Sequence, residues 1–173
     1  MTEPTVANDF QSRAVAPSDL PAIQHLHDSV FGPGALTRTA YRIREGMPAF
    51  TPFCRVVLHN TRIISSIRLT PICIGGQPGA LLLGPLAVDP VFANQGHGRR
   101  LVRESLDAAR DAGIALVLLV GDEAYYARLG FAPVQPVGRI LLPGPVDLRR
   151  ILAAELKPGS LATYAGMITA ASA

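Results

Sequence analysis

The sequence predicts a single α/β domain in which a mixed sheet carries helices on both faces. First, a strand, a helix and a second strand are expected in succession. Residues 81–88 are mostly apolar, an amphipathic helix starts near Gly98, and residues 115–120 form a continuous apolar run. Such a run is typical of a strand covered on both faces, and this succession forms a right-handed crossover between parallel strands. Second, segments 53–59 and 62–74 predict an antiparallel hairpin. Third, 173 residues fit one domain, 1–173.

The composition is that of a folded, soluble protein, with 49% hydrophobic and 17% charged residues. The N-terminus does not resemble a secretion signal and no apolar run approaches membrane-spanning length, so we expect a cytoplasmic protein with no membrane partner. The net charge of +3 raises nucleic acid as a partner. The basic residues are scattered and no aromatic residues alternate with them, so we expect no nucleic-acid binding.

Local signals divide the first half of the chain into short elements. Helix-opening and helix-breaking residues, alternating apolar residues and a glycine-rich turn mark their ends. In order, we expect a mobile tail at 1–8, an edge strand at 11–15, a helix from Ser18-Asp19 to about Phe31, a second helix at 36–45, the hairpin turning at Asn60-Thr61, and a turn at 75–79.

The strand at 81–88 is interrupted in its middle by Gly84-Pro85. Proline cannot donate a hydrogen bond to the ladder and glycine weakens it, so a bulge or splay is expected there. A cleft would then open between this strand and the strand at 115–120. Unpaired backbone groups of Leu86, Ala87 and Val88 could pair in this cleft with an extended ligand such as a pantetheine arm.

The start of the central helix predicts an anion-binding site. Two glycines interrupt the chain as it enters the helix, and the first N–H groups of a helix have no partner within it. These N–H groups, the helix dipole and two adjacent guanidinium groups favour a phosphate or pyrophosphate. The residues of this site are Gln95, Gly96, His97, Gly98, Arg99 and Arg100.

The last third of the chain predicts a short helix and several closing elements. Asp122 is a good cap for a helix at 123–129, and Gly130 is placed to end that helix in a left-handed conformation. The elements expected after it are strands at 134–137 and 139–142, a final helix at 147–156, and a strand at 162–168.

Two motifs together resemble the GNAT superfamily of N-acetyltransferases. Residues 95–100, QGHGRR, resemble its Gln/Arg-x-x-Gly-x-Gly/Ala signature, and residues 124–131, AYYARLGF, resemble its second signature, in which a tyrosine precedes Gly-Phe by four residues. The resemblance covers roughly residues 13–137. It departs at Arg100, where the superfamily usually has Gly or Ala. It implies a mostly antiparallel sheet that splays between its fourth and fifth strands.

The resemblance also implies the chemistry. Acetyl-CoA would bind at Gln95–Arg100 and along Leu86–Val88, and a neutral amine would attack its thioester directly in a ternary complex. Tyr126 occupies the position of the superfamily's general acid and would protonate the departing thiolate. Main-chain N–H groups near Leu86–Val88 could polarise the thioester carbonyl. The general base stays open among Glu45, Asp89, Glu123 and a chain of water molecules.

The sequence leaves several alternatives open. A non-catalytic acyl-CoA-binding or regulatory module would keep the glycines and arginines of the first motif, but it would not need Tyr126. The acceptor could be a small-molecule amine or a protein amine, and a homodimer is left open. By resemblance, the region between the first two helices borders the acceptor pocket, and the residues there that could contact a substrate are His25, His27, Asp28, Arg42 and Glu45. We expect no metal ion, because two histidines two residues apart on a helix do not face each other.

Overall fold

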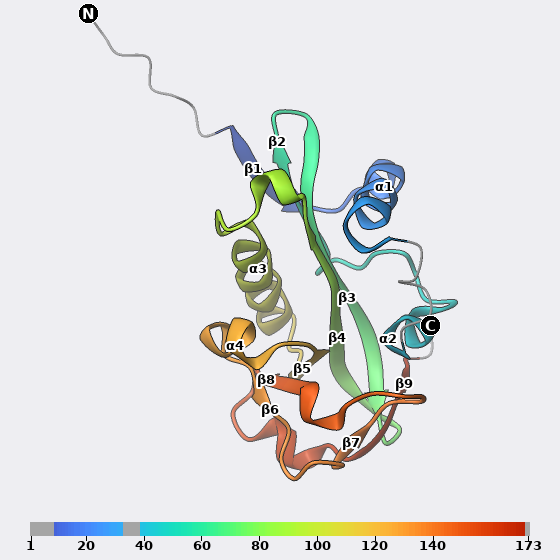
Figure 1. Cartoon of the computed structure of the whole chain (residues 1–173). Coiled ribbons are helices and arrows are strands. Elements are labelled where there is room, and N and C mark those ends of the chain that lie inside the picture. Colours follow the sequence, from blue (N-terminus) through green and yellow to red (C-terminus); the bar gives the residue numbers. More distant parts are fainter. Residues whose placement is uncertain (1–8, 33–38, 172–173) are drawn as a thin grey trace, which may run out of the picture.

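The computed structural model describes residues 9–32 and 39–171, and within them nine strands form one sheet in the main order β1-β2-β3-β4-β5-β8-β6, with β9 joining β3 to β7 (Figure 1). The predicted tail at 1–8 and the start of the predicted helix 36–45 lie outside the described residues. The strands are β1 (Phe10–Ala14), β2 (Arg55–His59), β3 (Arg62–Ile74), β4 (Gln77–Val88), β5 (Leu116–Val120), β6 (Ala132–Pro133), β7 (Ile140–Leu141), β8 (Ile151–Glu155) and β9 (Gly166–Ala170).

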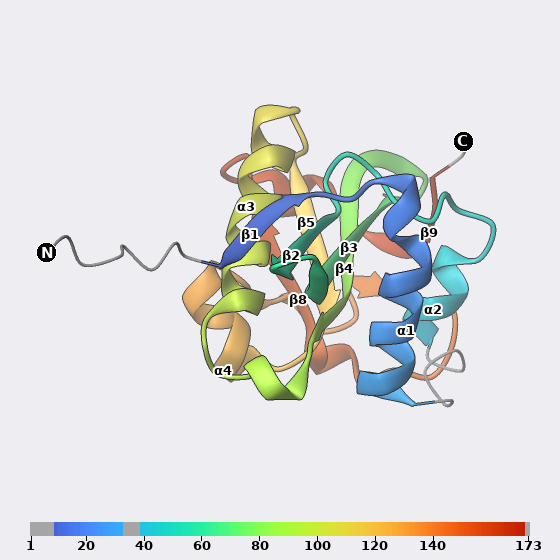
Figure 2. The ribbon, with the colours of Figure 1, turned by 90° about the horizontal axis from the view of Figure 1, so that it is seen from above.

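Helices cover both faces of the sheet, as predicted. α1 (Leu20–Phe31) and α2 (Thr39–Arg44) lie on one face, and α3 (His97–Asp111) and α4 (Glu123–Tyr126) lie on the other (Figures 1 and 2). The side of α3 that faces the sheet carries Leu101, Val102 and Ala109, each fully buried. The amphipathic pattern therefore predicted which side of this helix packs on the sheet.

The sheet is mostly antiparallel, and its one parallel pair on the main path is β4 with β5 in the described chain. Three residues of β4, Ala80 to Leu82, pair with Leu116 to Leu118 of β5, and no pairing follows beyond them. Since β4 continues to Val88 and β5 to Val120, the two strands separate after Leu82. This confirms the predicted crossover and the predicted splay between the fourth and fifth strands.

A bulge at Gly84-Pro85 changes the direction in which β4 presents its side chains. Leu83 pairs with Leu69 of β3 and Leu86 pairs with Ile67, so two β4 residues lie opposite the single residue Arg68. Side chains of a regular strand alternate between the two faces of the sheet. The extra residue of the bulge shifts this alternation by one position for the residues that follow it. Leu83 and Leu86 consequently both pack on the α3 side of the sheet.

The predicted final helix at 147–156 is wrong, because this segment is a short 3₁₀ turn at Leu148–Arg150 followed by strand β8. Leucine and alanine favour a helix locally, but β8 is paired on both sides, with β5 and β6, and its first four residues are buried. Smaller differences occur nearby. The strand predicted at 134–137 is wrong, because these residues form a bend and a turn after the two-residue strand β6 (Ala132–Pro133). The strand predicted at 162–168 is a 3₁₀ turn at Ser160–Thr163 followed by β9.

Glycines end two helices as predicted. Gly32 follows α1 with a φ of 69°, and Gly130 follows the 3₁₀ turn at Ala127–Leu129 with a φ of 92°. Asp122 occupies the N-cap position of α4, although its side chain makes no capping hydrogen bond. None of the helices in the described part of the chain has the length and apolar character needed to span a membrane.

Candidate active site

A cavity of about 580 Å³ opens where β4 and β5 separate. Its volume lies within the range usual for small-molecule sites. The wall is built from both faces of the sheet, because α2 contributes Tyr41 and Arg44 on one side and α4 contributes Tyr126 on the other. The remaining lining residues are Phe31, Ala40, Leu83, Gly84, Pro85, Leu86, Leu119, Val120, Leu142, Pro145, Val146, Asp147 and Arg150.

The start of α3 has free backbone donors, as the sequence predicts. Gly96 is the N-cap residue with a φ of 89°, and its carbonyl accepts a hydrogen bond from the Arg100 N–H at 3.0 Å. The backbone N–H groups of His97, Gly98 and Arg99 make no hydrogen bond with any described residue. Three donors therefore point out of a 15-residue helix at its positive end, which is the arrangement that attracts an anion.

Gly98 lets this helix end approach β4 closely. A Cβ at Gly98 would lie 3.3 Å from Val88 Cγ2 and 3.6 Å from Leu86 Cδ2, and 2.9 Å from the Tyr125 hydroxyl. The helix start, the end of β4 and α4 therefore meet at one place. Ala87, between the two β4 residues, points away from this place and packs with the buried Leu26 of α1.

The side chains of the first motif do not all lie at the anion-attracting start of α3. His97 packs into an aromatic cluster, 4.5 Å from the Phe10 ring, so only its backbone faces the helix end. The Arg100 N–H donates a hydrogen bond to the Gly96 carbonyl, and the Arg100 guanidinium forms an ion pair with Glu104 at 2.9 Å. Arg99 lies over the Tyr125 ring with its Cζ 5.7 Å from the ring centroid, and forms no ion pair with a described residue. Of the two arginines, Arg99 is the one available to an anion.

Tyr126 lines the cavity, and its hydroxyl has no hydrogen-bond partner among the described residues. Its ring packs edge-on against Phe131 at a centroid distance of 5.6 Å and lies against Gly121. Burial, followed by the neighbouring Tyr125, raises the pKa of Tyr126 to about 12. The phenol is therefore protonated at neutral pH and can donate a proton or a hydrogen bond into the cavity.

None of the three carboxylates considered as a general base lines the cavity. Asp89 is 6% exposed, pairs with Arg62 and accepts a hydrogen bond from the Val91 N–H at 3.0 Å, so it holds a turn together. Glu45 and Glu123 are exposed at the surface. Within residues 9–32 and 39–171, no cluster of three or more His, Cys, Asp or Glu side chains could hold a metal ion.

A second, smaller cavity of about 200 Å³ lies on the face of the sheet that carries α1 and α2. Of the residues that the sequence placed near an acceptor, His27 lines this cavity, with Nε2 3.1 Å from the Ser66 hydroxyl. Burial is the largest cause that lowers the pKa of His27, so its imidazole is neutral at pH 7. His25, Asp28, Arg42 and Glu45 are exposed and line neither of these two cavities.

Three residues that line these cavities belong to neither motif and were not predicted from the sequence. Tyr41 lines both cavities, Arg44 lines the large one and Arg68 lines the small one. A signal for Arg68 exists in the sequence, because Ser66, Arg68 and Thr70 are polar residues at every second position of the segment 62–74. That alternation predicts a polar strip on one face. Nothing in the sequence indicates that Arg44 is buried.

Residues 52–133 match the acetyltransferase (GNAT) domain family. Over 121 residues, the chain is 31% identical to the uncharacterized N-acetyltransferase YhbS of Escherichia coli K12, an alignment that spans 69% of this chain and 71% of that relative. The chain belongs to the GNAT family of acetyltransferases. The first motif, the second motif and the splayed sheet are thus features of a GNAT domain in this protein.

Two solved GNAT structures are similar to this fold. The structure of E. coli YhbS in complex with CoA superposes with a TM-score of 0.82 at 26% identity, covering 99% of this chain and 93% of that one. A GNAT acetyltransferase from Brucella melitensis in complex with acetyl-CoA gives a TM-score of 0.68 at 26% identity, covering 86% of this chain and 89% of the other.

Proposed function

We propose that this protein is an N-acetyltransferase that transfers the acetyl group of acetyl-CoA to a primary amine. The observation that carries the proposal is the cavity at the separation of β4 and β5, with the free N–H groups of α3 beside it and the unpartnered hydroxyl of Tyr126 in its wall. Family membership and the CoA and acetyl-CoA bound in two similar structures support it.

Acetyl-CoA would bind with its pyrophosphate at the start of α3. The N–H groups of His97, Gly98 and Arg99 provide backbone donors, and the Arg99 guanidinium adds charge. Gln95 and Gly96 shape the turn, and Arg100 contributes through its ion pair with Glu104 rather than by direct contact. The pantetheine arm would run along Leu86–Val88, on the edge of β4 that has no partner strand beyond Leu82.

The thioester would then lie at the opening of the sheet, where a neutral amine can attack it in a ternary complex. Attack forms the C–N bond, the tetrahedral intermediate expels the CoA thiolate, and the amine loses one proton. Tyr126 donates a proton to the departing sulfur. A backbone N–H of the β4 edge stabilises the oxyanion. None of Glu45, Asp89 and Glu123 lines the cavity, so a water molecule carries the amine's proton to solvent, and solvent returns a proton to the Tyr126 phenolate.

Isothermal titration calorimetry with acetyl-CoA tests the donor half of the proposal. Replacing Arg99→Gln removes one charged contact to phosphate and should weaken binding by roughly tenfold to a hundredfold. Arg103→Gln is the matched control, because Arg103 is exposed one turn further along α3, and its affinity should equal that of the parent protein. Unchanged affinity in a folded Arg99→Gln protein would contradict this placement, and absence of acetyl-CoA binding to the parent would contradict the function.

A further inference from the structure

One buried cation in the large cavity, Arg44, has no counter-ion among the described residues. The Arg44 side chain is 6% exposed, and it forms no hydrogen bond or ion pair with any described residue. Its buried Nε in particular has no partner. The guanidinium lies 5.8 Å from the centroid of the Tyr41 ring, a cation–π contact that offsets only part of the lost hydration.

The surroundings of Arg44 add positive rather than negative charge. Arg68 lies near enough to lower the pKa of Arg44, after burial as the larger cause, to about 10. Arg44 therefore stays protonated at neutral pH. Asp147 is the carboxylate that lines the same cavity, but its oxygens are held by Arg149 at 3.0 Å. Burying a cation that has no counter-ion is unfavourable. A ligand that brings an anion into the cavity would offset this cost.

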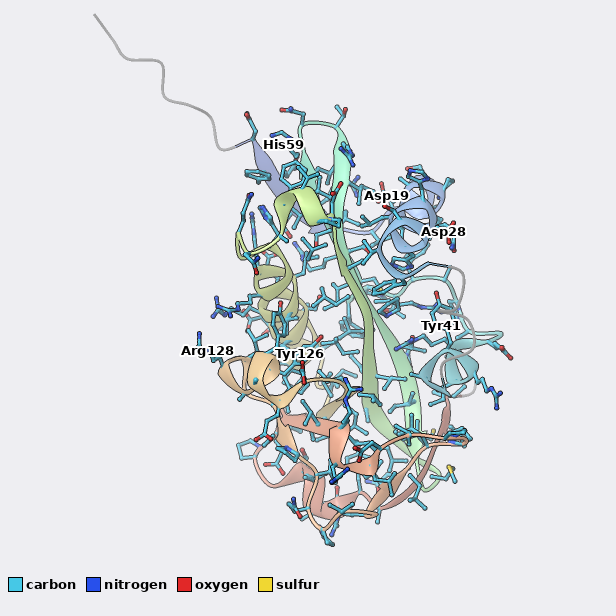
Figure 3. All side chains as sticks on the ribbon, viewed as in Figure 1. Asp19, Asp28, Tyr41, His59, Tyr126 and Arg128 are labelled. Atoms are coloured by element: carbon cyan, nitrogen blue, oxygen red, sulfur yellow. The ribbon has the colours of Figure 1, made fainter. Side chains whose placement is uncertain are left out.

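Arg44 lies at the bulge, on the face opposite the proposed CoA site. A Cβ at Gly84 would come within 2.9 Å of Arg44 Nη2, so the missing side chain of Gly84 leaves the space that the guanidinium occupies. Leu86, two residues on, faces α3 instead. Figure 3 shows Tyr41 and Tyr126 on opposite sides of the β3 and β4 ribbons. The guanidinium thus reaches the opening from the α2 side, where an acceptor would enter.

We propose that the acceptor is an amine that also carries an anionic group, and that Arg44 binds this group with Arg68 adding positive charge behind it. This inference rests on the proposed function and names its substrate class. A guanidinium can donate two parallel hydrogen bonds to a carboxylate or a phosphate. Carboxylate and phosphate are the two sources of this anion, and the test separates them.

The test compares amines in matched pairs, with acetyl-CoA as the donor and free CoA thiol as the readout. Carboxylate pairs are tyrosine with tyramine and lysine with cadaverine, and the phosphate pair is phosphoethanolamine with ethanolamine. In the parent protein, kcat/KM should be about 10²-fold higher for the anionic member of at least one pair. The pair that shows the preference identifies the anion.

The variants assign that preference to Arg44. In Arg44→Gln the ratio of kcat/KM within the pair should collapse toward one, and Arg44→Lys, which keeps the charge but not the paired donors, should be intermediate. Arg42→Gln is the matched control, since Arg42 is exposed on the same helix, and its ratio should equal the parent's. Calorimetry should give all these variants the same affinity for acetyl-CoA.

Thermal unfolding supplies a readout that does not need turnover. The anionic member of the pair should raise the Tm of the parent protein, with CoA present, and leave that of Arg44→Gln unchanged. Without ligand, Arg44→Met should be at least as stable as the parent, because it removes a buried unpaired charge. A large fall in Tm would assign Arg44 a purely structural role and overturn the inference.

The outcomes separate this inference from the proposed function. Turnover of amines with no preference for anionic ones, or weaker acetyl-CoA binding in Arg44→Gln, overturns the inference and leaves acetyl transfer standing. Absence of turnover with an Arg44-dependent rise in Tm supports the anion site and removes acetyl transfer. Neither turnover nor a rise in Tm with any pair overturns both.

Discussion

Two neighbouring tyrosines on α4 have different surroundings although their rings lie edge to face at 4.8 Å. Tyr126 lines the cavity, whereas the Tyr125 hydroxyl lies beside Gly98 and its ring lies under Arg99. Burial raises the pKa of both phenols. Protonation state therefore does not distinguish them as proton donors. Under the proposed function, their positions relative to the thioester would.

Replacing Tyr126→Phe should keep the packing on Phe131 and remove only the hydroxyl. If that hydroxyl acts in the transition state, kcat and kcat/KM should fall together by about 10²–10⁴, with little change in acetyl-CoA affinity. Steady-state turnover with the best amine of the panel measures this. Tyr125→Phe is the control and should lose far less. Equal turnover of Tyr126→Phe and the parent would remove Tyr126 from the mechanism.

Candidate site residues could be named from the sequence where a short motif contains them. Gly96, Gly98 and Tyr126 each belong to a signature of a few consecutive residues, so the pattern that identifies them lies within one short stretch of the sequence. Arg44 belongs to no such motif. Its burial depends on α2 packing against β9 and on the space left by Gly84, which are contacts between segments distant in sequence.

The same distinction holds at the scale of elements. The helix ends at Gly32 and Gly130 and the bulge at Gly84-Pro85 follow from local backbone chemistry, and they were predicted from single residues. β8 was predicted as a helix because its residues favour a helix locally and its strand state depends on β5 and β6 beside it. Pairing partners 19 to 39 residues away leave no signal within the segment itself.

The turn between β3 and β4 allows a sharp test at this scale. Gly75 and Gly76 both have positive φ angles, of 56° and 83°, but a Cβ at Gly75 would lie 2.1 Å from the Ala165 carbonyl oxygen, whereas a Cβ at Gly76 would meet nothing within 4 Å. Gly76→Ala should therefore cost ~1–2 kcal/mol of unfolding free energy from backbone strain alone. Gly75→Ala should cost more than ~3 kcal/mol, because the backbone that precedes β9 must move.

Chemical denaturation of the two variants and the parent measures both costs. Gly76→Ala is the control for the positive φ angle, so the difference between the variants reports the contact with Ala165. Equal destabilisation of the two variants would show that the turn and the start of β9 do not pack as described.

In the whole molecule, the cavity between β4 and β5 can be reached from both faces of the sheet. α3 and α4 cover the face that presents free backbone donors and Tyr126, and α1 and α2 cover the face that presents Arg44 and His27. Because β4 and β5 part after Leu82, a ligand on each face can reach the same cavity. Under the proposed function, acetyl-CoA and the acceptor amine would therefore be bound at the same time.

Initial-rate kinetics with both substrates varied show whether the two are bound together. Using the amine that turns over fastest, we expect double-reciprocal plots against acetyl-CoA, at several fixed amine concentrations, to intersect, as direct transfer in a ternary complex requires. Parallel lines, together with an acetylated protein detected by mass spectrometry after incubation with acetyl-CoA alone, would show a covalent acetyl-enzyme intermediate and contradict the account.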